Sequence, residues 1–375
     1  MKILIFINSL GAGGAERSMV EFAKFLNNEK DVSVKFICLK HKKIGLEEEV
    51  EASGLETIYF EGEGGFISKF LFLNRIINKE NPDIIHSVLA EANFVLRFSR
   101  LFIRKAKIVQ SLVSTPYSLE RKKDNKLSWR KFLLVKSLDK WTARITPDIF
   151  YHAISKEVHQ HYKILFNIKD NFKIIYRGRY ENNIQKTQSR YNEFKIINVG
   201  RQEFAKGQID ILKALLYLRE EHNINNIKLE IFGRPGQSSV KLNNFILQNK
   251  MSDQVKIEGF VSDVTNRLVN SQVFIFPSYY EGLGGALIEA FAARLPCICS
   301  DIPTLKEVVG KEDGALFSPP GDYRSLANNI LKLYRDEELR NKLSTHSYSR
   351  FRQAFRMEKI NKEMLDMYKE ILGSK

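Results

Sequence analysis

A short apolar run stops at a proline and is followed at once by a glycine-rich turn and a helical pattern, over residues 276–291. The letters are FPSYYEGLGGALIEAF, and VFIF at 273–276 predicts a buried strand before them. Gly282, Gly284 and Gly285 let backbone N–H groups approach a ligand, and the start of a helix adds partial positive charge. This part of the chain is therefore predicted to form a strand, a loop and a helix that suit a phosphate group.

Two carboxylates flank these glycines, Glu281 before them and Glu289 about one turn into the helix. A carboxylate repels a bare phosphate but accepts hydrogen bonds from hydroxyl groups. The pattern thus predicts a ligand with hydroxyl-bearing rings on both sides of its phosphates, as in a nucleoside diphosphate sugar. The alternative is a glycine loop that caps a solvated helix.

Strand and helix patterns alternate through the chain, which at 375 residues is long enough for two domains. The first series predicts strands at 3–7, 32–39, 55–60, 83–86 and 107–112, and helices at 15–28, 66–78 and 92–102. The second predicts strands at 195–199, 228–232, 255–258 and 273–276, and helices at 208–219 and 240–249. Each series predicts a parallel sheet covered by helices, and we interpret the polar, aperiodic residues 180–193 as the linker between them.

Two further loops follow predicted strands, where sheets of this kind bind ligands. NSLGAGGAER contains Gly13, Gly14 and Glu16, and the glutamate stands where a dinucleotide fingerprint requires glycine, which argues against a nicotinamide cofactor. VGRQEFAKGQ places Arg201 and Lys206 on one loop, and two cations there suit a diphosphate leaving group. The alternatives are a tight turn before a helix for the first loop and a solvated pair of cations for the second.

Together, EGLGGALIEA, GR-x4-KG and GGAER resemble the retaining glycosyltransferases of the family 4 type. That resemblance implies an α/β chain with the GT-B fold, in which two Rossmann-like domains face each other across a cleft. It implies an acceptor-binding domain at 1–178 and a nucleotide-sugar-binding domain at 195–355. The last helix, within 356–375, is expected to cross back onto the first domain.

The resemblance also implies roles for single residues. The implied catalytic residues are Glu281, Arg201 and Lys206. The implied donor-binding residues are Glu289, which would hold the ribose, and Gly13, Gly14, Gly233, Phe260, Gly284, Gly285, Ala286 and Leu287. Of these, Gly233 and Phe260 come from IFGRPG and EGFVS, which ordinary strand-to-helix turns would also explain.

On the acceptor side the candidates are Glu16 and His86. Many relatives carry a histidine after the fifth strand, where this chain has Val113 or Ser114. His86 is either a substitute for that histidine or a structural residue. The Asn-Gly of the family is also altered here, to Arg177 and Gly178.

No two aspartates in the sequence are separated by a single residue, so the metal-binding Asp-x-Asp of the other main glycosyltransferase architecture is absent. We expect no catalytic metal and no cofactor beyond the nucleotide sugar as co-substrate. Arg201, Lys206 and loop amides would then offset the charge of the departing diphosphate. The three cysteines are sparse, which predicts a reducing cytoplasm.

Positive charge is concentrated in one segment of a chain whose formal net charge is +15. Residues 97–144 hold 14 lysines and arginines against three acidic residues. FVLRFSRLFIR and SWRKFLLVKSLDKW predict two helices with cations opposite aromatic and aliphatic residues. They are either helices with their apolar faces on the sheet and their cations in water, or a face that binds an anionic membrane surface. Nucleic acid is disfavoured, because no binding motif accompanies the charge.

These patterns lead to two functional hypotheses. The first is a cytoplasmic enzyme, peripheral at the inner face of the cell membrane, that transfers sugar from a UDP-sugar. Its acceptor would be a saccharide or lipid-linked molecule in cell-surface polysaccharide or lipopolysaccharide synthesis. The second, suggested by the histidine missing near Val113, is a non-catalytic nucleotide-sugar-binding or scaffold subunit. The apolar start, KILIFI, is too short for a signal peptide core.

Overall fold

A computed structural model of the chain describes residues 1–42, 45–62, 64–103, 105–122, 128–181, 193–261 and 263–373. Its contacts divide the chain into two compact units. The first consists of Met1–Tyr117, Lys126–Arg177 and Glu358–Lys375, and the second of Ser118–Asn125 and Gly178–Met357. The predicted linker, 180–193, lies outside the described residues except at its ends.

The first unit has a seven-stranded sheet in the order β3-β2-β1-β4-β5-β6-β7, and all of its strand pairs are parallel. The strands are β1 (Lys2–Ile7), β2 (Ser33–Cys38), β3 (Glu56–Tyr59), β4 (Ile84–Val88), β5 (Lys107–Leu112), β6 (Ile149–Ala153) and β7 (Phe172–Ile174). The helices are α1 (Gly14–Asn27), α2 (Glu47–Ala52), α3 (Phe66–Glu80), α4 (Ala90–Ser99), η1 (Arg100–Phe102), α6 (Trp129–Ile145), α7 (Lys156–Phe166) and α15 (Met357–Gly373).

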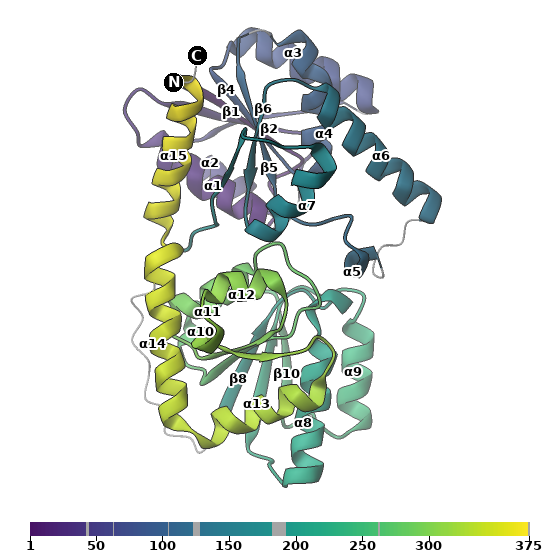
Figure 1. Cartoon of the computed structure of the whole chain (residues 1–375), viewed down its shortest axis with the longest axis vertical. Coiled ribbons are helices and arrows are strands. Elements are labelled where there is room, and N and C mark those ends of the chain that lie inside the picture. The colour runs from purple at the N-terminus through teal and green to yellow at the C-terminus, as the bar shows by residue number, and fades with distance from the viewer. Residues whose placement is uncertain are drawn as a thin grey trace. The chain divides into compact units, whose positions relative to one another are not determined.

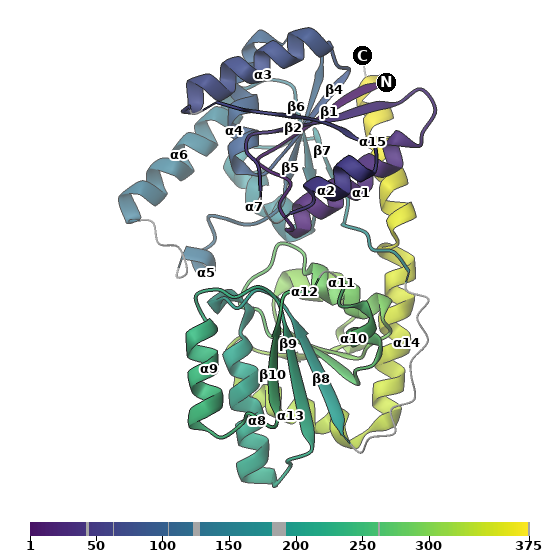
Figure 2. The same cartoon turned by 180° about the vertical axis from the view of Figure 1, so that it is seen from behind.

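Buried apolar strands explain why this sheet forms. Ile3, Leu4, Ile5, Phe6 and Ile7 of β1 are all fully buried, as expected for a central parallel strand with helices on both faces. Helix α15, from the far end of the sequence, packs beside α1 in the same hydrophobic cluster (Figures 1 and 2). The core of the first unit therefore requires the last helix of the chain.

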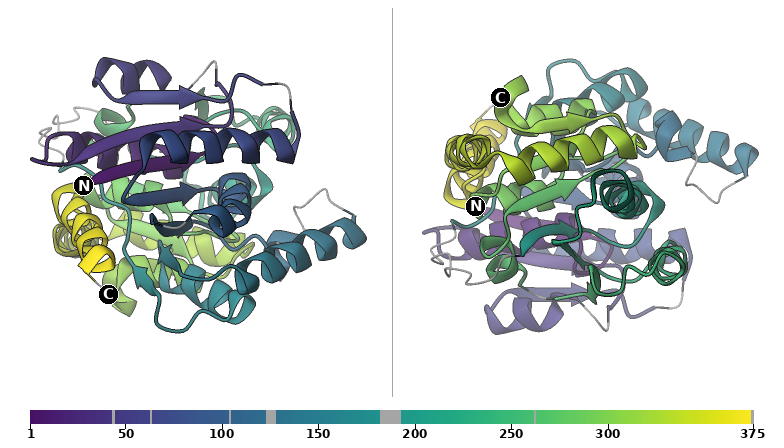
Figure 3. Two further views of the ribbon diagram at one scale, coloured as in Figure 1. Left: turned by 90° about the horizontal axis from the view of Figure 1, so that it is seen from above. Right: turned by 90° about the horizontal axis from the view of Figure 1, so that it is seen from below.

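The second unit has a six-stranded parallel sheet in the order β10-β9-β8-β11-β12-β13. Its strands are β8 (Phe194–Val199), β9 (Ile227–Phe232), β10 (Val255–Gly259), β11 (Val273–Phe276), β12 (Cys297–Ser300) and β13 (Leu316–Ser318). Its helices are α5 (Leu119–Lys122), η2 (Phe204–Lys206), α8 (Gln208–His222), α9 (Ser239–Gln248), α10 (Thr265–Val269), α11 (Gly285–Ala292), α12 (Pro303–Val309), η3 (Glu312–Gly314), α13 (Tyr323–Arg335) and α14 (Glu337–Ala354). Helices α8, α9 and α13 pack together, as do α10, α11 and α14, and α13 lies beside α8 (Figure 3, right).

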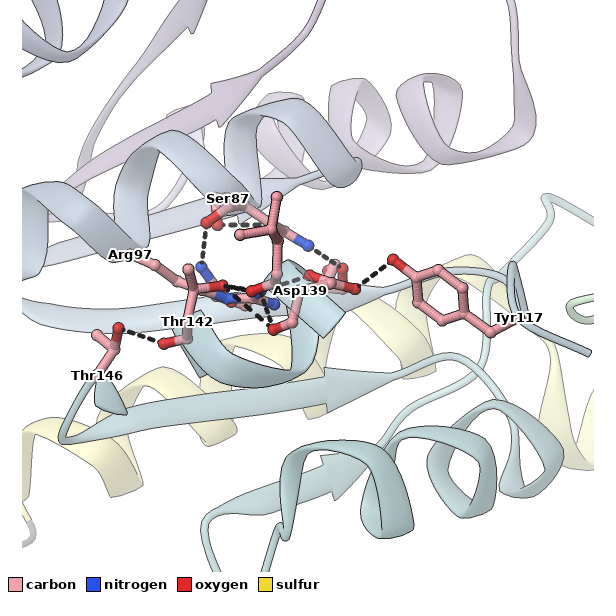
Figure 4. Close-up of polar contacts among 10 residues, drawn as sticks. Ser87, Arg97, Tyr117, Asp139, Thr142 and Thr146 are labelled. Atoms are coloured by element: carbon pink, nitrogen blue, oxygen red, sulfur yellow. Dashed lines mark hydrogen bonds and ion pairs between the residues drawn. The ribbon is translucent and has the colours of Figure 1, made fainter. Parts of the chain in front are cut away.

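Helix α4 is oriented opposite to the sequence prediction. Arg97 was expected to face water or a membrane, but its side chain is only 2% exposed. Its guanidinium donates to Asp139 Oδ1 at 2.5 Å and to Gln110 Oε1 at 3.0 Å, and Tyr117 donates to the other Asp139 oxygen (Figure 4). Tertiary hydrogen bonds thus override the amphipathic pattern, because α6 brings a carboxylate to a position that no local sequence pattern predicts.

The phenylalanines of α4 form part of an aromatic cluster instead. The ring of Phe66, on α3, lies 5.5 Å from that of Phe94 and 4.9 Å from that of Phe98. Leu101 and Phe102, in η1, remain largely exposed. Among the helices in the described part of the chain, none has both the length and the apolar character needed to cross a lipid bilayer.

Candidate functional site

The two loops with predicted phosphate-binding residues lie at the switch point of the second sheet. Strands β8 and β11 are neighbours there, and the chain runs outward from β8 in opposite directions through β9 and β11. Open parallel sheets bind ligands in the crevice at such a point. The loops are joined by a hydrogen bond from the Tyr279 amide to the Ala205 carbonyl at 2.8 Å. Gly207 has φ +62°, and a Cβ there would collide with the Pro277 carbonyl.

Lys206 and Glu281 meet at this point. The Nζ atom of Lys206 lies 2.5 Å from Oε1 of Glu281, and their side chains are 19% and 11% exposed. Ser278 donates to the same carboxylate oxygen at 2.9 Å, and the Thr304 hydroxyl donates to the Glu281 carbonyl at 3.2 Å. Lys206 and Glu281 are 75 positions apart in the sequence, and the pairing of β8 with β11 brings them together. This places one cation and one hydrogen-bond acceptor at the switch point of the sheet.

Helix α11 begins at the same edge. Gly284, its N-cap, has φ +92°, which a side chain would disfavour, and Gly285 is the first helical residue. The first turn contains no acidic side chain, so its amides present unopposed positive potential. Ala286 is partly exposed in this turn. An anion can therefore bind at the start of α11, a short distance along the loop from Glu281.

Leu287 lies in the core of the second unit. Its side chain is fully buried, and its amide donates to the Gly284 carbonyl at 3.0 Å. The apolar residues of a helix that covers a sheet face inward, which explains this burial. The side chain therefore anchors α11, and the donor-binding role of Leu287 stays a prediction.

Glu289 has a partner that the sequence reasoning missed. Arg179 donates from Nε to Glu289 Oε1 at 2.8 Å, and a Cβ at Gly285 would lie 2.6 Å from Arg179 Nη2. The guanidinium therefore lies over the start of α11 and adds a cation there. The one signal in the sequence was an Arg-Gly-Arg at 177–179, where we noted an altered Asn-Gly.

Arg201 is on the predicted loop but does not join the Lys206 and Glu281 pair. Its guanidinium lies 2.9 Å from Glu203 Oε1, and its side chain is 64% exposed. Its exposure leaves the long side chain on the surface of the loop, beside the partly exposed Glu203. In this structure Lys206 alone of the predicted cation pair is bound to Glu281.

The other predicted donor residues, Gly233 and Phe260, follow β9 and β10, the two strands on one side of β8. Gly233, after β9, has φ +143°, and a Cβ would collide with the Gly200 carbonyl. Phe260, after β10, is half-exposed, and the guanidinium of Arg234 lies 4.6 Å from its ring centroid. The rest of the predicted EGFVS segment ends at Ser262, which lies outside the described residues. An exposed ring flanked by a cation gives a flat surface on which a base could stack.

In the first unit, Gly13 is the N-cap of α1, and Gly14 and Glu16 lie in its first turn, at the switch point of that sheet. The Glu16 carboxylate lies over Gly13, where a Cβ would collide with it. A Cβ at Gly14 would come within 3.3 Å of the Arg177 guanidinium. The glycines thus let the Glu16 carboxylate and the Arg177 guanidinium approach the backbone closely, and Glu16 places a negative charge at the start of α1.

His86 lies in the core, as the structural alternative expected, and its acceptor role stays a prediction. It lies in the middle of β4, fully buried. Its ring nitrogens lie 2.5 Å from the Tyr368 hydroxyl and 2.7 Å from Ser111 Oγ, and Ser111 Oγ lies 2.8 Å from His152 Nδ1. This chain of hydrogen bonds connects α15 to three strands. Val113, where many relatives have histidine, follows β5 and packs against the core.

The buried histidines predict that stability falls in mild acid. Burial lowers the pKa of His152 to about 4 and that of His86 well below its usual value. Unfolded histidines titrate near 6.5, so the unfolded chain binds more protons between pH 4 and 6.5, and stability is lost as pH falls through that window. His152 alone accounts for roughly 3 kcal/mol.

Urea unfolding at pH 7.0 and 4.5 measures this difference. His152→Asn should shrink it clearly, because the substituted side chain does not titrate. His222→Gln, which changes an exposed histidine on α8, is the control and should leave it unchanged. Equal pH dependence in the wild type and in His152→Asn would contradict the assignment.

Comparisons with known proteins bear on this site. Residues 12–179 match the family model described as Glycosyltransferase Family 4, and residues 179–350 match the one described as Glycosyl transferases group 1. The capsular polysaccharide biosynthesis glycosyltransferase CapH of Staphylococcus aureus is 27% identical over 314 residues, which are 82% of this chain and 83% of that protein. An alpha-1,4-N-acetyl-D-galactosaminyltransferase of Campylobacter jejuni, named for a substrate linked to PP-undecaprenol, is 24% identical over 387 residues and 99% of both chains.

Solved structures show the same arrangement of elements. HepE of Anabaena, solved in complex with UDP, aligns with a TM-score of 0.84 and 17% identity over 99% of this chain and 100% of that chain. Sucrose-phosphate synthase of Thermosynechococcus elongatus aligns with a TM-score of 0.80 and 18% identity over 100% of both chains. At these identities the likeness establishes the fold.

Proposed function

We propose that this chain, which belongs to the glycosyl transferases group 1 family, is a retaining enzyme that uses a UDP-sugar. The chain has the GT-B fold, as the sequence motifs predicted. It is a glycosyltransferase, in agreement with its named relatives. The observation that carries the proposal is the contact of Lys206 with Glu281 at the switch point of the second sheet. A fixed cation there suits a diphosphate, and a carboxylate beside it suits sugar hydroxyls.

The residues of the site support distinct roles in this proposal. The amides at Gly284 and Gly285 and the ammonium of Lys206 would bind the diphosphate, whose charge grows as the bond to the sugar breaks. Glu281, held by Ser278, would accept hydrogen bonds from the transferred sugar, and Glu289 would accept them from the ribose. With these charges in place we propose that the reaction needs no metal ion.

Retention follows, in this proposal, from attack on the face that the diphosphate leaves. The departing phosphate oxygen accepts the proton of the acceptor hydroxyl, so the reaction needs no side-chain base in the first unit. The site supports this route, because the Lys206 ammonium and the amides of α11 lie on one edge of the sheet and can stabilise the phosphate in place. It is also consistent with the burial of His86 and with the absence of histidine at Val113.

Uridine is proposed as the base because HepE, which has the same fold, was solved with UDP. A saccharide or lipid-linked acceptor is proposed because the Campylobacter jejuni relative is named for a PP-undecaprenol-linked substrate and CapH for capsular polysaccharide biosynthesis. Both proposals concern the ligands of the site.

The direct test is to incubate the purified chain with a panel of nucleotide sugars and to measure released nucleoside diphosphate. We expect release from at least one UDP-sugar, faster when a lipid-linked saccharide is added. NMR of the product should show the anomeric configuration of the donor. Binding of a UDP-sugar without any release of UDP would contradict the proposal and favour a chain that only binds the nucleotide sugar.

Membrane association is proposed from the surface of α6. Leu134, Leu138, Trp141 and Ile145 recur at helical spacing and are between 42% and 59% exposed. Their stripe is bordered by the exposed cations Arg130, Lys131, Lys140 and Arg144. The amino-terminal half of α6 extends away from the sheet (Figures 1 and 2). An apolar stripe beside cations is typical of helices that lie in the headgroup layer of an anionic membrane.

Replacing Leu138 and Trp141 by glutamate should weaken binding to phosphatidylglycerol vesicles by about tenfold or more, because both apolar area and charge complementarity are lost. Co-sedimentation measures the effect. Leu247→Glu, which changes an exposed leucine on α9, is the matched control and should have little effect. Equal binding of the control and the double variant would contradict this role for α6.

A further inference from the structure

A pocket in the second unit lies along α14, and no predicted donor-site residue lines it. Its volume is about 630 Å³, and its lining includes Arg294, Arg352 and Arg356. The remaining lining residues are serines, a threonine, a tyrosine and a glutamine, so none of the described residues that line it is acidic. Three guanidinium groups around one pocket create a strong positive potential.

Two of the arginines lie at one aromatic ring, that of Tyr348. The Arg294 guanidinium carbon lies 3.9 Å from the ring centroid of Tyr348, and that of Arg352 lies 5.9 Å away. The Tyr348 hydroxyl donates to Glu181, which also faces Arg352 at 3.9 Å and Arg356 at 3.7 Å. The hydrogen bond from Tyr348 and the three arginines lower the pKa of Glu181. One carboxylate, that of Glu181, thus lies close to two of the arginines that line the pocket.

The backbone at Arg294 gives an independent indication. Helix α11 ends in a Schellman motif, in which the Leu295 amide donates to the Ala290 carbonyl at 3.0 Å and the Arg294 amide to the Phe291 carbonyl at 3.1 Å. Arg294 occupies the left-handed position of this motif, with φ +60°. Glycine is the usual residue there, since a side chain disfavours that conformation. An arginine in this strained position, with its guanidinium over the Tyr348 ring and lining the pocket, indicates that its side chain is used.

We propose that this pocket binds a phosphate group, with Arg294, Arg352 and Arg356 as its ligands. Guanidinium groups offer paired N–H donors that match phosphate oxygens, and three of them line this pocket. The Tyr348 ring fixes the direction of two of the guanidinium groups. The phosphate belongs either to a small soluble compound or to a lipid headgroup.

Calorimetric titration of the full chain with inorganic phosphate tests the site, at low ionic strength and with UDP present to fill the donor site. We expect one saturable site in the wild type. Arg294→Gly and Arg352→Gln should each weaken it by roughly tenfold or more, the usual loss for a hydrogen bond to a charged group. Arg294→Gly is suited to the test because glycine fits the backbone better, so lost binding cannot be assigned to misfolding.

Lys342→Gln is the control, since Lys342 is an exposed cation on the same helix outside the pocket, and it should bind within twofold of the wild type. Phosphatidylglycerol vesicles form the second arm of the experiment. If the wild type does not bind free phosphate and the two arginine variants lose vesicle binding, the phosphate group that the pocket binds is that of a lipid headgroup. Absence of saturable binding in both arms, or an equal loss in Lys342→Gln, overturns the proposal.

Discussion

Lys206→Ala should lower the turnover number for sugar transfer by about 10²- to 10³-fold, the usual effect of removing one group that stabilises developing negative charge. Lys206 is the cation bound at the switch point, within 2.5 Å of Glu281 and in the loop that contacts the β11 loop. Its charge acts mainly when the diphosphate departs, so the turnover number should fall more than donor affinity. Steady-state kinetics with the preferred nucleotide sugar measures both.

Two further variants separate a direct role of Lys206 from an indirect one. Alanine at this position also leaves the Glu281 carboxylate without its ammonium partner. The double variant Lys206→Ala with Glu281→Gln is therefore compared with Glu281→Gln alone, because Glu281 is itself proposed to bind the transferred sugar. If the unpaired charge caused the loss, the two would have equal turnover; we expect the double variant to be slower. Lys256→Ala, which changes an exposed lysine on β10, is the control and should keep normal turnover. Normal turnover in Lys206→Ala would overturn the proposed mechanism.

Asp139→Ala should destabilise the first unit by about 3–5 kcal/mol, because it leaves the buried charge of Arg97 without its carboxylate. The Arg97 guanidinium also donates to Gln110 and Thr142 and lies 4.6 Å from the ring centroid of Phe166, so it cannot swing into water (Figure 4). Arg97→Met should cost less, since the Asp139 side chain is 20% exposed and keeps its hydrogen bond from Tyr117. Urea unfolding monitored by tryptophan fluorescence of α6 measures both.

The double variant Arg97→Met with Asp139→Leu should recover much of the lost stability, because apolar side chains of similar volume often replace a buried ion pair without cost. Lys140→Met, beside Asp139 but exposed, is the control for the loss of a cation and should change stability little. The decisive result is which of the two single variants, Asp139→Ala or Arg97→Met, loses more free energy of unfolding. If Arg97→Met were the more damaging, Arg97 would be important for packing more than for its charge.

The residues of the candidate site could be predicted where a single loop contains both the backbone signal and the residue types that a ligand needs. The glycines at 282–285 define a strand, a loop and a helix start by local rules, and β11 begins and ends at the predicted residues 273 and 276. Lys206 and Glu281 were each identified from a separate loop by the residue types that a diphosphate sugar needs. Their direct contact was not predicted, since it depends on β8 and β11 being neighbours.

The sequence patterns did not predict burial where distant segments decide it. Arg97 was expected to be exposed, yet it donates to Asp139 of α6 and is buried. For His86 both alternatives were open, and the contact with Tyr368 from the last helix places it in the core. Arg179 was missed for the same reason, because its partner Glu289 is 110 residues away. Leu287 was assigned to the ligand by its place in a motif, although its spacing on α11 already favoured the core.

The sequence alone determined the two series of strands and helices, the glycine-rich loops and the residue types that suit a nucleoside diphosphate sugar, because apolar periodicity and backbone freedom are properties of short segments. Only the tertiary structure decided which charges are paired, which are buried and which remain available to a ligand. The physical reason is that burial and ion pairing depend on groups brought together by strand order and helix packing, and these partners lie tens to hundreds of residues apart.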